Sequence, residues 1–227
     1  MEVVHLAALA GVRRGEEYRN EYLSTNVMGT DNILKMCEKY QVSRAILFSS
    51  SSIYGEGDGK PNSFYGMTKA MGELLPYRYD IKKVFIVRPF TVYGENGRGD
   101  QVIYKWINQI KNKKPITFYG EGTSERSYTY VGDLVDGVLL LLKENAGERL
   151  SIETYDFGGK ESITLRQLFN IFVEELDSFD VEYASKPKAD VMKNVADISK
   201  AKRVLGYDPK ANFNEKVRSI IKKEFNL

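Results

Sequence analysis

The chain has 227 residues, of which 42% are hydrophobic and 28% charged, and its formal net charge is +2 at pH 7. These values are ordinary for a soluble globular protein of one large or two small domains, and they give no reason to expect nucleic acid or an anionic membrane as a partner. A single cysteine excludes an internal disulfide, and with only one histidine beside it there can be no His/Cys zinc site, so we expect no metal.

Targeting signals are not visible in the sequence. The start of the chain lacks a basic segment, and its apolar run is short. The longest aliphatic run, Val138–Leu142, falls far below the ~20 residues that a membrane span requires. We therefore expect a cytoplasmic protein with no membrane partner.

The first half of the chain predicts alternating strands and helices. In order, these are strand Val3–Leu6, helix Glu16–Tyr40, strand Arg44–Phe48, a helix opened by Tyr65, and strand Val84–Val87. The second helix should end near Leu75, because a proline at position 76 would cost a helix interior ~3 kcal/mol. Continuous apolar strands separated by helices indicate a parallel sheet covered on both faces.

Beyond Tyr93–Gly97 the predicted elements become shorter and more polar. They are helix Gln101–Lys111, strand Ile116–Tyr119, helix Val131–Lys143 with Asp133 as its candidate cap, a strand and turn at Tyr155–Gly159, helix Leu165–Leu176 capped by Thr164, helix Ile198–Leu205 ended by Gly206, and helix Asn214–Phe225.

The chemistry-bearing residues follow the second strand. Ser49–Ser52 leave that strand, and Tyr65 and Lys69 are four residues apart, so they project from one helix face. A tyrosine is a poor base at its usual pKa of ~10, but a nearby cation lowers that pKa. Ser50 could bond the substrate oxygen and pass its proton to Tyr65. With an oxidised nicotinamide as hydride acceptor, these groups could oxidise a sugar hydroxyl.

Each of these motifs alone also has a structural interpretation. A serine run after a strand is usually a loop, and Tyr79 and Lys83 match the same Tyr-x-x-x-Lys spacing. The combination is far more specific: strand, serine cluster, Tyr-Gly, loop, Tyr-x-x-x-Lys, strand, and then the segment Arg88–Gly94.

With these motifs the chain resembles the NAD-dependent epimerase/dehydratase family, the extended short-chain dehydrogenases/reductases that act on nucleotide sugars. The matching segments are His5–Ala8, Asn26–Thr30, Ser49–Gly55, Tyr65–Lys69, Arg88–Gly94, Tyr119–Gly122, Arg126–Val131, Ala196–Ala201 and Leu205–Tyr207. The resemblance implies an α/β fold with a Rossmann-like parallel sheet in residues 1–93 and a smaller C-terminal α/β substrate-binding lobe in residues 94–227. Parts of about 131–158 would return to the sheet.

The resemblance also implies residue roles, with NAD as cofactor and a nucleotide sugar as partner. The catalytic residues would be Ser50, Tyr65 and Lys69. The cofactor would contact Leu6, Ala7, Ala8, Asn26, Phe48 and Pro89, together with Tyr65 and Lys69. The substrate would contact Ser51, Ser52, Thr91, Tyr119 and Arg126. Arg126 could also be a solvated surface charge, although arginine suits bidentate phosphate binding.

Within the family, the side chains of this chain favour one reaction. Dehydratases resemble one another in an Asp-Glu pair at the positions of Ser51 and Ser52, and decarboxylating relatives carry Glu at the second of these. The reductase/3,5-epimerase branch uses a Cys and a His, whereas Cys37 here falls in a predicted helix and His5 in a strand. This leaves a 4-epimerase acting on UDP-glucose or UDP-glucuronate (a UDP-hexose or UDP-hexuronate).

The chain also departs from the family pattern. It has no Gly-x-Gly-x-x-Gly or Gly-x-x-Gly-x-x-Gly loop and begins at the equivalent of the family's fourth strand, so we expect an N-terminally truncated sheet with an open edge. Lys186 or Lys188 would replace an arginine that relatives use for a second phosphate contact. Pro76 alters a helix that relatives use for dimer packing.

Two readings therefore stay open. The chain is an epimerase core that is incomplete alone, with a second copy or a complementing N-terminal segment as protein partner. Alternatively, it is a non-catalytic remnant that binds a nucleotide sugar or a partner protein.

Overall fold

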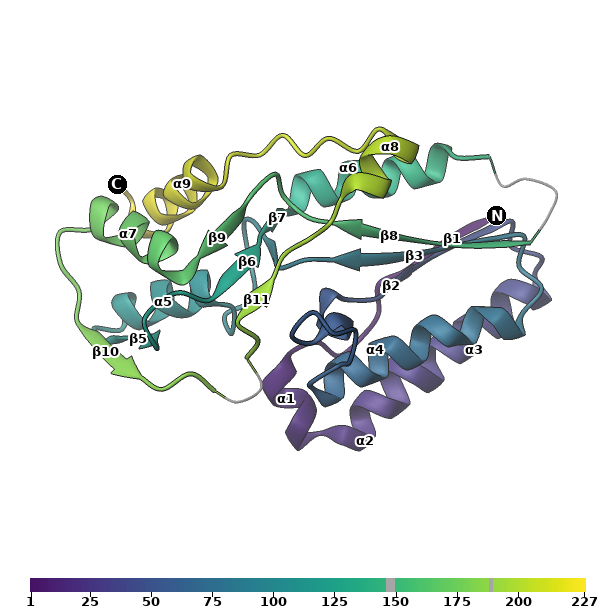
Figure 1. The fold of residues 1–227 in the computed structure, drawn as a ribbon, viewed down its shortest axis with the longest axis horizontal. Helices are drawn as coiled ribbons and strands as arrows, with labels where there is room; N and C mark the ends of the chain where they lie inside the picture. The colour runs from purple at the N-terminus through teal and green to yellow at the C-terminus, as the bar shows by residue number, and fades with distance from the viewer. Residues whose placement is uncertain (146–149, 188–189) are drawn as a thin grey trace.

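The computed structural model describes residues 1–145, 150–187 and 190–227. Its centre is a four-stranded parallel sheet in the order β1-β2-β3-β8, shown in Figure 1. The strands are β1 (Glu2–His5), β2 (Arg44–Phe48), β3 (Lys83–Pro89) and β8 (Ser151–Phe157). The inner strands β2 and β3 are largely buried, whereas β1 pairs only with β2 and leaves an open edge within the described residues. The predicted α/β class with a parallel sheet is confirmed.

Helices cover both faces of this sheet (Figure 1). One face carries α1 (Val12–Glu17), α2 (Arg19–Tyr22), a π-helical turn (Leu23–Met28), α3 (Gly29–Lys39) and α4 (Phe64–Leu74). The other face carries α6 (Val131–Lys143) and α8 (Ser199–Leu205). The first predicted helix therefore starts earlier than expected and is interrupted at Tyr18 before running on to Lys39.

Pro76 ends α4 as the sequence predicts. The α-helix stops at Leu74, and a 3-10 turn, Leu75–Arg78, follows with the proline at its start. A proline is tolerated at that position because its missing N–H would have had no helical partner there.

The C-terminal lobe has its own aromatic core. Its elements are β4 (Val92–Tyr93), α5 (Val102–Lys111), β5 (Ile116–Tyr119), β6 (Glu125–Ser127), β7 (Thr129–Tyr130), β9 (Ser162–Thr164), α7 (Leu165–Glu175), β10 (Val181–Ala184), β11 (Lys193–Asn194) and α9 (Phe213–Phe225). Trp106 is fully buried at its centre, stacked on Phe118 and edge-on to Phe172. Its Nε1 donates to the Thr117 carbonyl at 3.0 Å, which satisfies the buried indole.

Three segments from the C-terminal half lie with the main sheet rather than with this core. These are β8 and α6, both within the predicted stretch 131–158, and α8, which lies outside it. Ala201 and Leu205 of α8 share a hydrophobic cluster with Ile46 and Phe85 of the sheet. Strand β8 pairs with β3 along its whole length, so the two halves of the chain are tied together.

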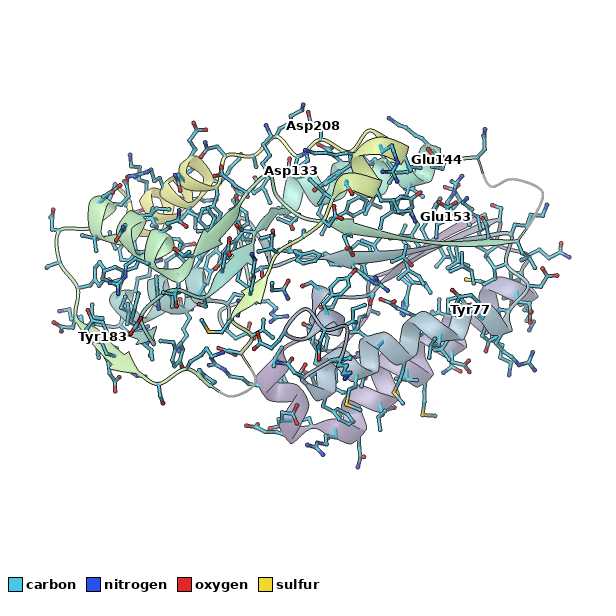
Figure 2. The ribbon with its side chains drawn as sticks, viewed as in Figure 1. Tyr77, Asp133, Glu144, Glu153, Tyr183 and Asp208 are labelled. Atoms are coloured by element: carbon cyan, nitrogen blue, oxygen red, sulfur yellow. The ribbon has the colours of Figure 1, made fainter. Side chains whose placement is uncertain are left out.

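The helix caps agree with the sequence in two cases out of three. Thr164 and Gln167 form a reciprocal capping box, and Gly206 adopts the left-handed conformation, with φ 70°. The expected cap at Asp133 is wrong, because its carboxylate accepts instead from the backbone N–H groups of Lys210 (2.9 Å) and Ala211 (3.1 Å). Asp133 thereby fastens α6 to the segment carrying Asp208 that leads into α9 (Figure 2).

Within the described residues, none of the helices is long and apolar enough to cross a membrane. In the same part of the chain, no group of three or more His, Cys, Asp or Glu side chains could hold a metal ion.

Candidate active site

Residues Ser49–Tyr54, which we call the serine segment, leave β2 at the carboxyl end of the sheet. The Ser49 N–H donates to the Val87 carbonyl at 2.7 Å, so the segment starts as an extension of the sheet. Ser50 is extended and caps the 3-10 helix Ser51–Tyr54, its Oγ accepting from the Ser52 N–H at 3.1 Å. The hydroxyls are therefore fixed by local backbone bonds at the sheet edge where parallel α/β folds bind ligands.

Helix α4 packs directly against this segment. Ser63 caps the helix by accepting from the Gly66 N–H at 3.1 Å. A Cβ on Gly66 would lie 2.5 Å from the Ser52 carbonyl oxygen, so only glycine permits this approach. The approach brings the Tyr65 phenol close enough to Ser50 for that side chain to act on its pKa. Tyr22 packs edge-on against the Tyr65 ring, with centroids 6.2 Å apart.

Tyr65 and Lys69 both have shifted pKa values. Burial raises the pKa of Tyr65, opposed by the Ser50 hydrogen bond and by the positive charge of Arg98. Burial lowers the pKa of Lys69 to about 8, opposed by the negative charge of Glu73. A cation that acts on the Tyr65 phenol in this structure is thus Arg98, which comes from the loop after β4.

A cavity of about 860 Å³ opens beside Ser50 and Tyr65, within the size range of small-molecule sites. It lies between the sheet and the C-terminal lobe. All the residues predicted to contact the substrate line it, and so do two predicted to contact the cofactor: Ser51, Ser52, Thr91, Tyr119 and Arg126 for the substrate, and Tyr65 and Pro89 for the cofactor.

The other predicted cofactor residues lie elsewhere. Lys69, Asn26 and Phe48 surround a small void behind Ser49. Leu6, Ala7 and Ala8 line neither space, and Leu6 is 59% exposed.

Asn26 braces the segment that follows β1 against α4. Its side-chain amide donates to the Leu9 carbonyl at 2.9 Å and to the Thr68 hydroxyl at 3.0 Å, and its oxygen accepts from the Leu9 N–H at 2.7 Å. These bonds fix the segment that follows β1 next to the helix that carries Tyr65.

Lys69 provides a test of whether the site suits the nicotinamide ribose. Its side chain is buried, and among the described residues its ammonium group takes part in no hydrogen bond or ion pair. A lysine on the wall of this void, with its donors free, fits the hydroxyl-rich ribose that the resemblance assigns to it.

Positive charge dominates the larger cavity. Its lining includes the cations Arg13, Arg14, Arg98, Lys105, Arg126 and Lys186, against the carboxylates Asp100 and Asp190. Tyr119 lies between two of these cations, with Arg13 5.2 Å and Lys105 5.0 Å from its ring centroid. Such an excess of cations suits a diphosphate.

Arg126 contributes its charge without a carboxylate partner among the described residues. Its guanidinium donates to the backbone carbonyls of Glu125, Val191 and Met192, and burial lowers its pKa. The predicted alternative cation Lys186 lines the cavity and donates to the Asp190 carbonyl at 2.6 Å, whereas Lys188 lies outside the described residues.

Sequence reasoning missed several of these cations. Arg13 and Arg14 come shortly after the small residues Ala10 and Gly11 that follow the first strand, and this basic pair is the signal by which the sequence could have indicated them. Arg13 reaches across to the C-terminal lobe and pairs with Asp190 at 3.2 Å. No local pattern distinguishes Lys105 from the other lysines of the chain.

Comparison with known proteins adds the family. Residues 1–152 match the model of the NAD dependent epimerase/dehydratase family. A UDP-glucuronate 4-epimerase from Thermodesulfobacterium geofontis is 37% identical over 96% of this chain and 71% of its own length.

Two solved structures are also similar. The UDP-glucuronic acid 4-epimerase from Bacillus cereus, in complex with UDP-glucuronic acid and NAD, is 30% identical with a TM-score of 0.88, covering 97% of this chain and 75% of that one. The protein MoeE5, in complex with the same two ligands, is 30% identical with a TM-score of 0.90, covering 100% and 80%.

Proposed function

We propose that this chain, which belongs to the NAD dependent epimerase/dehydratase family, forms the catalytic core of a UDP-sugar 4-epimerase. The observation that carries the proposal is the placement of Tyr65 beside the serine hydroxyls on the wall of a cation-rich cavity. Hydroxyls occupy positions 51 and 52, so the site offers proton transfer at an alcohol rather than the acid–base pair that elimination needs.

Each side chain has a part in this chemistry. Tyr65 accepts the proton of the sugar 4-hydroxyl through Ser50 and later returns it, while NAD, when bound, supplies the hydride acceptor. Lys69 holds the nicotinamide ribose, and Phe48, Pro89, Asn26 and Leu6–Ala8 form the remaining cofactor side. Ser51, Ser52 and Thr91 bond the sugar, and Tyr119 and Arg126 hold the uridine diphosphate. In this division residues 1–93 form the cofactor side and carry the hydroxyls that face the sugar, and residues 94–227 hold the uridine diphosphate, with the described parts of 131–158 in the sheet.

UDP-glucuronate is the substrate that we favour over UDP-glucose. Arg98 lines the cavity, and its positive charge opposes the rise that burial causes in the pKa of Tyr65. Its bidentate pair with Asp100 is solvent-accessible. A sugar carboxylate near C4 would be attracted to this guanidinium, which a neutral hexose would not. Two of the similar proteins named above are UDP-glucuronate 4-epimerases, whereas MoeE5 was solved with either UDP-glucuronic acid or UDP-glucose and does not discriminate between them.

The proposal is tested by assaying the purified chain with NAD and each UDP-sugar and following the C4 epimer by NMR. Any nucleotide released on denaturation is identified by mass spectrometry, and NAD is titrated separately. Formation of the C4 epimer supports an epimerase, with faster turnover expected for UDP-glucuronate. UDP-sugar binding with NAD bound but no turnover would reject catalysis and favour the non-catalytic alternative.

We also propose that the chain forms a homodimer through α4. Met67, Met71 and Leu74 are 47%, 45% and 70% exposed and lie at i, i+4 and i+7, so they form one apolar stripe on that helix. Met28, on the π-helical turn that packs beside α4, is 64% exposed and extends the stripe. A patch on neighbouring helices can meet its own copy across a two-fold axis.

The open edge of β1 is the surface that we propose for a complementing strand-forming segment.

Charging this stripe should separate the dimer. We expect Met71→Glu combined with Leu74→Glu to convert the dimer to monomer in sedimentation velocity, because two carboxylates would be buried without partners. Val204→Glu is the matched control, because Val204 is similarly exposed but lies on α8, across the sheet. A parent chain that sediments as a monomer would contradict the proposal.

A further inference from the structure

A polar network with Glu73 at its centre connects the catalytic helix to the serine segment. The Glu73 carboxylate accepts from Ser49 Oγ and from Arg88 Nε (2.9 Å), and it also pairs with Arg88 Nη2. Arg88 Nη1 donates to the Tyr54 hydroxyl at 2.7 Å, and that hydroxyl donates to Asp156 at 2.8 Å. The network thus joins α4, the serine segment, β3 and β8.

The two attachment points lie at the ends of the serine segment. Ser49 precedes the catalytic Ser50, and Tyr54 ends the 3-10 helix that holds Ser51 and Ser52. The Glu73–Arg88 pair is therefore hydrogen-bonded to both ends of the segment that carries the serine hydroxyls. The pair is largely shielded from water, with 12% of the Glu73 and 22% of the Arg88 side chain exposed, so its bonds are strong and directional.

Glu73 also belongs to the helix that carries the other catalytic groups. Tyr65, Lys69 and Glu73 follow one another at four-residue intervals on α4 and share one face. Any shift of the carboxylate would move the serine segment relative to Tyr65. We infer that Glu73 is a positioning residue for this site, which holds Ser50 against Tyr65 through its bonds to Ser49 and Arg88 and places its carboxylate on the same void as Lys69. The catalytic part of this inference rests on the proposed function, whereas the geometry of the network does not depend on it.

The groups around Lys69 show why Glu73 determines its charge. The void beside Lys69 is lined by the titratable side chains His5 from β1 and Glu73 from α4, and by the neutral polar side chains of Asn26, Thr30 and Ser49 from the other elements. Burial and the Lys69 charge lower the pKa of His5, so His5 is neutral where Lys69 titrates. Glu73 is the negative charge that keeps the pKa of Lys69 near 8 against burial.

The first test titrates Lys69 directly, by NMR of the ¹³C-lysine-labelled chain, with the signal assigned through Lys69→Arg. In Glu73→Gln we expect the midpoint to fall by about one pH unit, because the stabilising charge is lost while the Ser49 contact can remain. Glu21→Gln, an exposed glutamate on α2, should leave it unchanged. An unchanged midpoint in folded Glu73→Gln would overturn the inference. This readout needs no turnover, so an inactive chain would reject the proposed function and not this role.

The second test separates positioning from charge. Tyr54→Phe removes one hydroxyl from the network and leaves Glu73 in place, so we expect kcat for epimerisation to fall about tenfold with KM and the Lys69 midpoint unchanged. This variant also decides the case if Glu73→Gln does not fold. A kcat equal to that of the parent chain, with an intact melting temperature, would show that the network does not position the serine segment.

Discussion

Replacing Tyr65 with phenylalanine should reduce epimerisation by about 10²- to 10⁴-fold while leaving UDP binding within about twofold of the parent chain. The phenol is the proton acceptor of the proposed reaction, whereas the ring fills the same space and keeps its edge-on contact with Tyr22. The change thus removes the chemistry and preserves the packing. Turnover is measured as C4 epimer formed per unit time, and UDP affinity by calorimetry.

Tyr79→Phe is the matched control for this prediction. Tyr79 and Lys83 repeat the Tyr-x-x-x-Lys spacing, but Tyr79 lies beyond the end of a 3-10 turn and Lys83 lies in β3. Tyr79 bonds Asp31 at 2.5 Å, and Lys83 pairs with Glu153, so each has a structural partner. We expect unchanged turnover in this variant. Equal losses in both variants would mean that the Tyr65 effect is not catalytic.

This comparison shows what the sequence can and cannot predict. Continuous apolar runs located β2 and β3, and Pro76 located the end of α4, because those signals are local. The same reliance on local signals gave the wrong role for Asp133, whose partners lie more than seventy residues further along the chain. A helix-cap pattern describes only neighbouring residues and carries no information about such a partner.

The candidate site shows the same division between local and long-range signals. Ser50, Tyr65 and Lys69 were recognisable from a joint motif, since the segment and the helix follow one another closely in the chain. The network of Glu73, Tyr54, Arg88 and Asp156 was not, because its members come together only through the order of strands β2, β3 and β8. The cations near Tyr65 are a related case. The four-residue spacing placed Lys69 on the same helix face as Tyr65, but it could not indicate Arg98, whose positive charge also acts on the pKa of Tyr65 from a loop distant in the chain.

Replacing Arg126 should weaken UDP binding without destabilising the free protein. Its half-buried guanidinium has only backbone carbonyls as partners among the described residues, and burial lowers its pKa, so the free protein holds a poorly compensated charge. A bound diphosphate would supply the missing negative charge. Arg126→Met should therefore weaken UDP binding by about 10- to 100-fold, the equivalent of one charge-assisted contact, without lowering the melting temperature of the free protein.

Arg203→Met provides the comparison, because Arg203 is exposed on α8 and lines no part of the cavity. We expect its UDP affinity to equal that of the parent chain. If Arg126→Met bound UDP normally, Arg126 would be a surface charge and the remaining cations would hold the diphosphate. If it bound poorly and also melted well below the parent, the carbonyl contacts between β6 and the segment at Val191 and Met192 would be its main role. Weak binding with undiminished stability is the result that assigns Arg126 to the ligand, because only a missing anion explains a cation that the free protein does not need.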